Sequence, residues 1–145
     1  MKNILVFLPF ICWTAVAKAQ AVNPDIIPTN TKAAFNQRFG TASDWIWNVS
    51  GENGYSVVFK YENSRHYAEV KSSGEISLLK YEIKETDLPF YIQDVLKTEY
   101  PNHQIHEIDK IEKNDLIQYE VELEGYPDYI ILFDPLGMVV EKKVD

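Results

Sequence analysis

The sequence repeats itself once, and this duplication limits the chain to folds made of two similar units. Ile27-Pro28 opens the first copy, and Leu88-Pro89 opens the second about 61 positions later. A helix start, a hairpin and a closing turn then recur in the same order. The matched positions are Ala34 with Val95, Phe35 with Leu96, Phe39 with Tyr100, Tyr55 with Tyr119, Val57 with Val121, Phe59 with Leu123 and Gly74 with Gly137.

Each copy is predicted to begin with a helix. Asp87 is expected to cap the second helix and one of residues 29–31 the first, because short polar side chains accept hydrogen bonds from free amides at a helix start. Gly40 and Pro101 are expected to end the two helices. Apolar residues recur at helical spacing in both segments: Ala34, Phe35 and Phe39, then Ile92, Val95, Leu96 and Tyr100.

Four strands are predicted to follow each helix. Along 119–124, apolar residues alternate with glutamates, as expected for a sheet with one buried and one wetted face. The fold class is therefore α+β: a tandem duplication of a helix plus a four-stranded antiparallel unit, forming one long antiparallel sheet with both helices packed on one face. Turns are predicted at Asn53-Gly54, Asn63-Ser64-Arg65, Ser72-Ser73-Gly74, Lys113-Asn114-Asp115, Gly125-Tyr126-Pro127-Asp128 and Asp134-Pro135-Leu136-Gly137.

The first 19 residues are predicted to be a cleavable signal peptide. Lys2 precedes an apolar run at 4–16, which is too short to span a membrane, and small residues allow cleavage after Ala19 or after Ala21. Cys12, the only cysteine, lies within this segment, so no disulfide is expected in the mature chain. The predicted divisions are 1–19 signal peptide, 20–26 flexible leader, 27–86 first repeat and 87–145 second repeat.

The charge of the chain argues against two classes of partner. The formal net charge is −8 at pH 7, and removal of the signal peptide, with its two lysines, makes it more negative. Such a surface repels nucleic acid and anionic lipid. We therefore expect neither nucleic acid binding nor membrane insertion after cleavage.

No residue pattern indicates catalysis, a metal or a cofactor. The sequence lacks a nucleophile elbow, and the many carboxylates alternate along predicted strands as a solvated face would. His103 and His106 are three apart, which in a strand directs the two rings to opposite faces. An enzyme that uses His66 or the His103/His106 pair remains the least favoured alternative.

Aromatic residues are the strongest indication of a binding surface. Several lie on predicted strands or beside turns, where tyrosine and tryptophan commonly act as interface anchors, although core packing would also account for most of them. The candidate partner-binding residues are Trp45, Trp47, Tyr61, Tyr67, Tyr126 and Tyr129.

The duplicated pattern resembles the PepSY-like family of exported bacterial proteins, whose fold is similar to that of beta-lactamase inhibitory protein. The resemblance rests on the Leu88-Pro89 helix, the Tyr100-Pro101 stop, the 119–123 strand and the 133–137 turn. The resemblance implies a long antiparallel sheet whose open face binds a partner. It implies no catalytic residues, because the family has no catalytic motif.

The expected function is a non-catalytic periplasmic or secreted binding module. In this hypothesis the open sheet face engages a protein or peptide, possible roles being those of an inhibitor or a propeptide. The alternative is a small-ligand or envelope-sensing domain, which would need a closed apolar pocket between the helices and the sheet.

Overall fold

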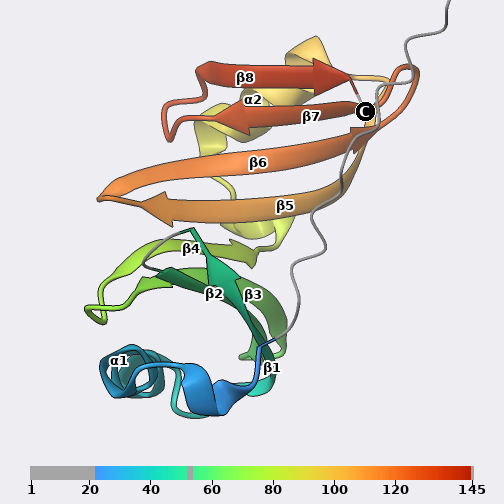
Figure 1. The fold of residues 1–145 in the computed structure, drawn as a ribbon. Helices are drawn as coiled ribbons and strands as arrows, with labels where there is room; N and C mark the ends of the chain where they lie inside the picture. Colours follow the sequence, from blue (N-terminus) through green and yellow to red (C-terminus); the bar gives the residue numbers. More distant parts are fainter. Residues whose placement is uncertain (1–21, 52–53, 145) are drawn as a thin grey trace, which may run out of the picture.

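The computed structural model describes residues 22–51 and 54–144. The predicted signal peptide, the first two leader residues and Asn53 of the predicted first hairpin lie outside the described residues. A helix followed by four strands occurs twice (Figure 1). The elements are η1 (Pro24–Ile26), α1 (Thr29–Phe39), β1 (Ser43–Ser50), β2 (Gly54–Tyr61), β3 (Ser64–Lys71), β4 (Ile76–Glu82), η2 (Glu85–Asp87), α2 (Phe90–Glu99), β5 (Gln104–Lys113), β6 (Leu116–Glu124), β7 (Tyr129–Phe133) and β8 (Val139–Val144).

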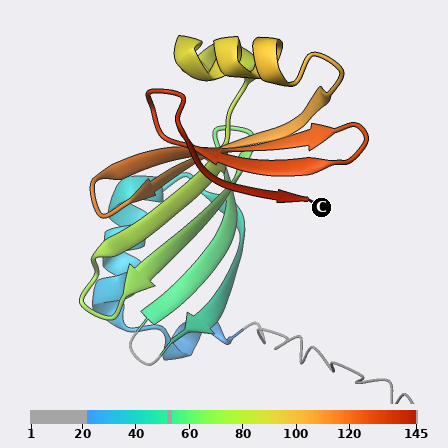
Figure 2. The same cartoon turned by 90° about the horizontal axis from the view of Figure 1, so that it is seen from above.

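All eight strands form one antiparallel sheet in chain order, from β1 to β8. Figure 1 shows this order from bottom to top, and Figure 2 shows that β5–β8 are rotated relative to β2–β4 by the twist of the sheet. The pairing of β4 with β5 joins the two halves. The predicted fold class is confirmed.

Both helices cover the same face of the sheet. Leu79 of the first core pairs with Glu112 on β5, and residues 108, 110 and 112 share one face of that strand. Ile108 belongs to the second core, so the two cores lie on one face. We call the opposite face, which neither helix covers, the open face. Its residues include Val58, Arg65, Tyr67, Lys80, Glu82, Glu107, Asp109, Ile111, Glu120 and Glu122.

Each half has its own hydrophobic core beneath its helix. Aromatic rings dominate the first core: Phe35 packs edge-on against Phe59, with centroids 4.9 Å apart, and against Trp47 at 5.2 Å. The first core contains Ile27, Phe35, Phe39, Trp47, Val57, Phe59, Ala68, Val70 and Leu79. The second contains Leu88, Ile92, Leu96, Tyr100, Ile108, Tyr119, Val121, Leu123, Ile131 and Phe133.

The helices begin differently from the sequence prediction. Pro28 and Pro89 occupy the N-cap positions, and neither helix has a side-chain cap. The expected caps at 29–31 and at Asp87 were therefore wrong, because Asp87 lies in η2 and residues 29–31 are already helical. The residues before the prolines, Ile27 and Leu88, are buried and anchor each helix start to its core.

The turns follow the sequence with one displacement. Glu62 and Asn63 both have positive φ angles, and β3 starts at Ser64, so the β2–β3 turn begins one residue earlier than the predicted Asn63-Ser64-Arg65. Asn114 and Asp115 form the corresponding positive-φ pair between β5 and β6. In the last turn, the Asp134 carboxylate accepts hydrogen bonds from the amides of Leu136 and Met138.

A polar cluster closes the joint between the halves on the helix-covered face. Glu112 on β5 accepts a hydrogen bond from the Tyr81 hydroxyl at 3.1 Å and pairs with Lys110 at 3.1 Å and Arg38 of α1 at 3.3 Å. Burial alone would raise the pKa of Glu112, but Lys110 and Tyr81 stabilise the carboxylate, and the pKa is lowered. The cluster therefore fastens α1 to the first strand of the second half.

Candidate functional site

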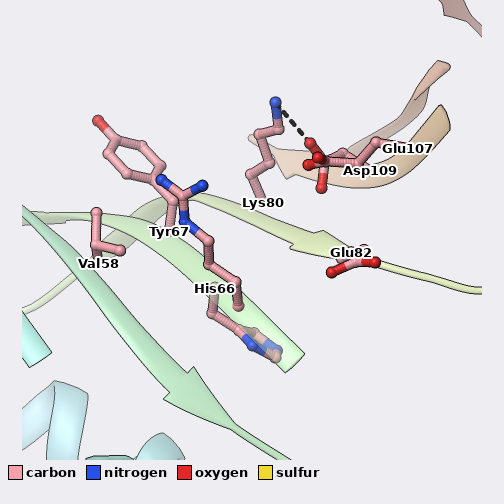
Figure 3. Close-up of a pocket in the computed structure, with 8 residues that line it drawn as sticks. Val58, His66, Tyr67, Lys80, Glu82, Glu107 and Asp109 are labelled. Carbon is pink, nitrogen blue, oxygen red and sulfur yellow. Dashed lines mark ion pairs between the residues drawn. The ribbon is translucent and has the colours of Figure 1, made fainter. Parts of the chain in front are cut away.

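A groove of about 320 Å³ lies on the open face where β3, β4 and β5 meet (Figure 3). It spans the joint between the two halves, because β4 ends the first half and β5 begins the strands of the second. The lining residues are Val58, Arg65, His66, Tyr67, Lys80, Glu82, Glu107 and Asp109. Most of them alternate with core residues along their strands, which directs their side chains away from the helices.

Lys80 lies at the centre of the groove and links three strands. Its ammonium group is 2.7 Å from Asp109 Oδ2 on β5 and 2.7 Å from Glu120 Oε1 on β6. Burial would lower the pKa of Lys80, but the two carboxylates more than offset it, and the pKa is raised. Lys80 is therefore held as a cation, and the dashed line in Figure 3 marks its ion pair with Asp109.

An apolar strip adjoins the charged part of the groove. Cross-strand pairing sets Ile46, Val58 and Tyr67 side by side on β1, β2 and β3, and the same row continues through Lys80 to Ile111 on β5. We call this set the cross-sheet row. The row gives the open face apolar surface next to fixed charges.

Tyr67 lines the groove, and its hydroxyl is fixed by a neighbouring carboxylate. The hydroxyl donates to Glu69 Oε1 at 3.0 Å. Burial is the main cause that raises the pKa of Tyr67, and the hydrogen bond to the Glu69 carboxylate raises it further. The phenol therefore stays neutral and acts as a donor.

Acidic groups crowd the β5 side of the groove. Burial raises the pKa of Glu107, and the nearby charges of Asp109, Glu122 and Glu82 raise it further, whereas Lys80 lowers it. Lys80 is already paired with Asp109 and Glu120. The negative potential around Glu107 is therefore only partly compensated.

The two candidate tryptophans lie in different environments. Trp47 is 4% exposed and belongs to the first core, so it is not available to a partner, and the predicted surface role was wrong for this residue. Trp45 is 46% exposed. Strict alternation along β1 would put both rings on one face, but the β1–β2 register shifts between Ser43 and Ile46, beside a positive φ at Asp44.

The four candidate tyrosines do not form one surface. Tyr67 lies in the groove, whereas Tyr61 packs edge-on against Phe39 on the helix-covered face. Tyr126 is 100% exposed in the β6–β7 turn. Tyr129 packs against the second core, with Lys142 Nζ 3.7 Å from its ring centroid. Their binding roles stay predictions, and Tyr67 is the only member of the candidate set that lines the groove.

The histidines are dispersed. His66 stacks on Tyr81 within the first half, with ring centroids 5.1 Å apart, and the side chain points away from Tyr67 in Figure 3. His103 Nε2 is 3.0 Å from the Pro127 carbonyl oxygen, and His106 Nδ1 is 3.0 Å from Glu124 Oε1. The three rings therefore do not converge on one pocket.

A second open space lies beside α2. It has a volume of about 430 Å³ and is bordered by polar groups of Glu85, Gln93 and Lys97 as well as by Leu96 and Ile105. It opens to solvent at the end of the helix, unlike the enclosed apolar pocket expected of a small-ligand domain.

One group of metal-ligating side chains was not indicated by the sequence. His106, Glu107 and Glu122 each offer one ligand atom, and these atoms lie within 4.8 Å of one another. Two of the three residues are adjacent in the sequence, which would normally direct them to opposite faces of a strand.

Within residues 22–51 and 54–144, no helix is long and apolar enough to cross a membrane.

Several solved structures of Bacteroides proteins have a similar fold. A "putative periplasmic" protein of Bacteroides eggerthii is 14% identical, with a TM-score of 0.71 over 81% of this chain and 88% of that chain. A DUF2874 family protein of Bacteroides uniformis is 16% identical, with a TM-score of 0.70 over 81% of this chain and 88% of that chain.

A BLIP-like protein of Bacteroides fragilis also shares the fold. It is 14% identical, with a TM-score of 0.66 over 81% of this chain and 86% of that chain. No curated protein sequence matches the chain. The sequence profile described as "Putative beta-lactamase-inhibitor-like, PepSY-like" matches residues 53–141, which is more than half of the chain.

Proposed function

Since the chain belongs to the PepSY-like family, we propose that it is a non-catalytic module that binds a protein or peptide through its open sheet face. The proposed location is the periplasm or the exterior of the cell, after removal of the predicted signal peptide. The "putative periplasmic" description of a protein with the same fold supports this location.

The observation that carries the proposal is the cross-sheet row beside the groove. Ile46 is exposed, and Val58 and Tyr67 are half-buried, so the row offers apolar contact area without a covering helix. Lys80 and its two carboxylates, adjacent to this area, are already held in place and need little further ordering. Aromatic and apolar anchors beside fixed polar groups are typical of protein interfaces.

The sharper form of the proposal is an inhibitor-like or propeptide-like role toward a hydrolase. The fold shared with a BLIP-like protein supports this form. The open face is suited to an extended segment or a loop, because the groove runs across several strands.

The alternative of a small-ligand domain has less support. Such a domain needs an apolar cavity between the helices and the sheet, and large side chains such as Phe59 and Phe133 fill the two cores there. The open face is therefore the better candidate for recognition.

Site-specific photo-crosslinking in the cell envelope of the source organism tests the proposal. A photoreactive residue at Val58 or Ile46 should trap the same partner repeatedly, because both positions lie in the cross-sheet row. The same residue at Asp94, which is exposed on α2, is the matched control. A partner trapped equally from Asp94, or no reproducible partner from Val58 and Ile46, would contradict the proposal.

A further inference from the structure

We propose that His106, Glu107 and Glu122 form a binding site for a divalent transition-metal ion of the Zn²⁺ class. The site lies on the open face next to the groove, since Glu107 lines both. This metal site is additional to the proposed binding of a protein or peptide.

A bulge in β5 brings the three residues together. Ile105 pairs with Leu123 and Glu107 pairs with Glu122, so β5 advances by two residues while β6 advances by one. His106 is the extra residue, and a bulge sets two consecutive residues opposite one residue of the neighbouring strand. The imidazole and the Glu107 carboxylate therefore both approach Glu122, with their ligand atoms within 4.8 Å.

The local charge favours a bound cation. Glu107 pairs with Glu122 across β5 and β6, and Asp109 and Glu82 line the same groove, so four carboxylates lie close together on the open face. Lys80, the cation whose charge acts on Glu107, is engaged by Asp109 and Glu120. A metal ion at Glu107 and Glu122 would compensate charge that the protein leaves in excess.

The ligand atoms select the class of metal. One imidazole nitrogen with two carboxylate oxygens suits Zn²⁺ and neighbouring transition metals, whereas Ca²⁺ and Mg²⁺ prefer oxygen ligands alone. Glu124 Oε1 is 3.0 Å from His106 Nδ1 and can accept a hydrogen bond from Nδ1–H, so that Nε2 would be the ring nitrogen offered to the metal. Three protein ligands leave a coordination position for water or for a group of a partner.

Calorimetric titration of the purified, untagged protein with Zn²⁺ tests the site. We expect about one ion per chain, half-saturation at micromolar Zn²⁺, and no comparable binding of Mg²⁺. His106→Ala and Glu122→Gln should each weaken Zn²⁺ binding at least about tenfold. His103→Gln, a histidine substitution outside the group, should leave the affinity unchanged.

Co²⁺ absorption spectra provide a second measurement, because nitrogen coordination alters the visible bands and His106→Ala should remove that change. Circular dichroism establishes that each variant is folded. Failure to saturate below about 1 mM Zn²⁺ would overturn the proposal. Equal affinities of the His106→Ala, Glu122→Gln and unmodified proteins would also overturn it. No partner enters the titration, so its failure would leave the binding proposal untouched.

Discussion

Lys80 Nζ lies 2.7 Å from Asp109 Oδ2, and this ion pair connects the last strand of the first half to the first strand of the second. Only 10% of the Asp109 side chain is exposed, so its charge has lost most of its hydration. A carboxylate in that position is tolerated because a cation faces it. The ion pair is therefore part of the joint as well as part of the groove.

Removal of Lys80 should destabilise the fold. Lys80→Met leaves Asp109 and Glu120 without their shared cation, and we expect a loss of about 1–3 kcal/mol of unfolding free energy. Lys143→Met is the matched control, because Lys143 pairs with Glu141 at 3.1 Å on the exposed edge strand β8. Urea denaturation should show that Lys143→Met loses less than about 0.5 kcal/mol of unfolding free energy. Equal losses would show that the Lys80 pairs are no stronger than a surface pair.

Replacement of Glu107 should stabilise the protein at neutral pH. The pKa of Glu107 is raised above its usual 4.5, so the folded state binds a proton more tightly than the unfolded chain. This group therefore makes stability fall as pH rises above 4.5 through its folded pKa. Glu107→Gln should raise the melting temperature by about 1–2 °C at pH 7. The gain should shrink towards zero as the pH falls below about 4, where the carboxyl becomes protonated in both states. A gain independent of pH would contradict this cause.

Alanine substitution of the glycines in the two closing turns should destabilise the protein. Gly137 has φ +84°, and a Cβ there would lie 3.0 Å from the Tyr91 carbonyl oxygen. Gly74 has φ +93°, and its Cβ would lie 3.1 Å from the Asn30 carbonyl oxygen. We expect each alanine variant to lose about 1–3 kcal/mol.

Gly51→Ala separates backbone strain from steric contact. Gly51 has φ +65°, but a Cβ would meet nothing within 4 Å. Its variant should lose about 1 kcal/mol, less than the other two. Thermal unfolding of the three variants checks this order, and a larger loss at Gly51 would refute the contact argument.

The two tryptophans of β1 should respond differently to truncation. Trp47→Ala opens a cavity beside Phe35 and should cost about 3–5 kcal/mol. Trp45→Ala removes an exposed ring and should cost less than about 1 kcal/mol. Denaturant unfolding of both variants measures this difference, and similar losses would place Trp45 in the core as well.

The regular parts of the fold could be predicted from the sequence because they depend on local periodicity. Helical spacing located both helices, and turn residues located most strand ends. The predicted caps at 29–31 and at Asp87 were wrong because buried Ile27 and Leu88, held by tertiary packing, decide where the helices begin. A capping prediction considers only neighbouring residues.

The groove could be predicted only in part, because it depends on register between separate strands. Lys80 and Asp109 are 29 positions apart in the printed sequence, and only the pairing of β4 with β5 brings them together. Tyr67 was proposed from its residue type and lies in the groove, although its binding role stays a prediction. Trp47 was proposed in the same way, but it is buried in the first core. The bulge at His106 likewise changes which side chains meet, and the residue types around it do not indicate that β5 contains an unpaired residue.

The chain-order arrangement of the strands also bears on how the protein reaches its native state. Six of the seven strand pairings close over short turns, so they cost little loop entropy. The exception is β4 with β5, whose closure encloses η2 and α2. Low contact order of this kind favours rapid folding from local hairpins. We therefore expect the hairpins within each half to form early and the pairing of β4 with β5 to form last.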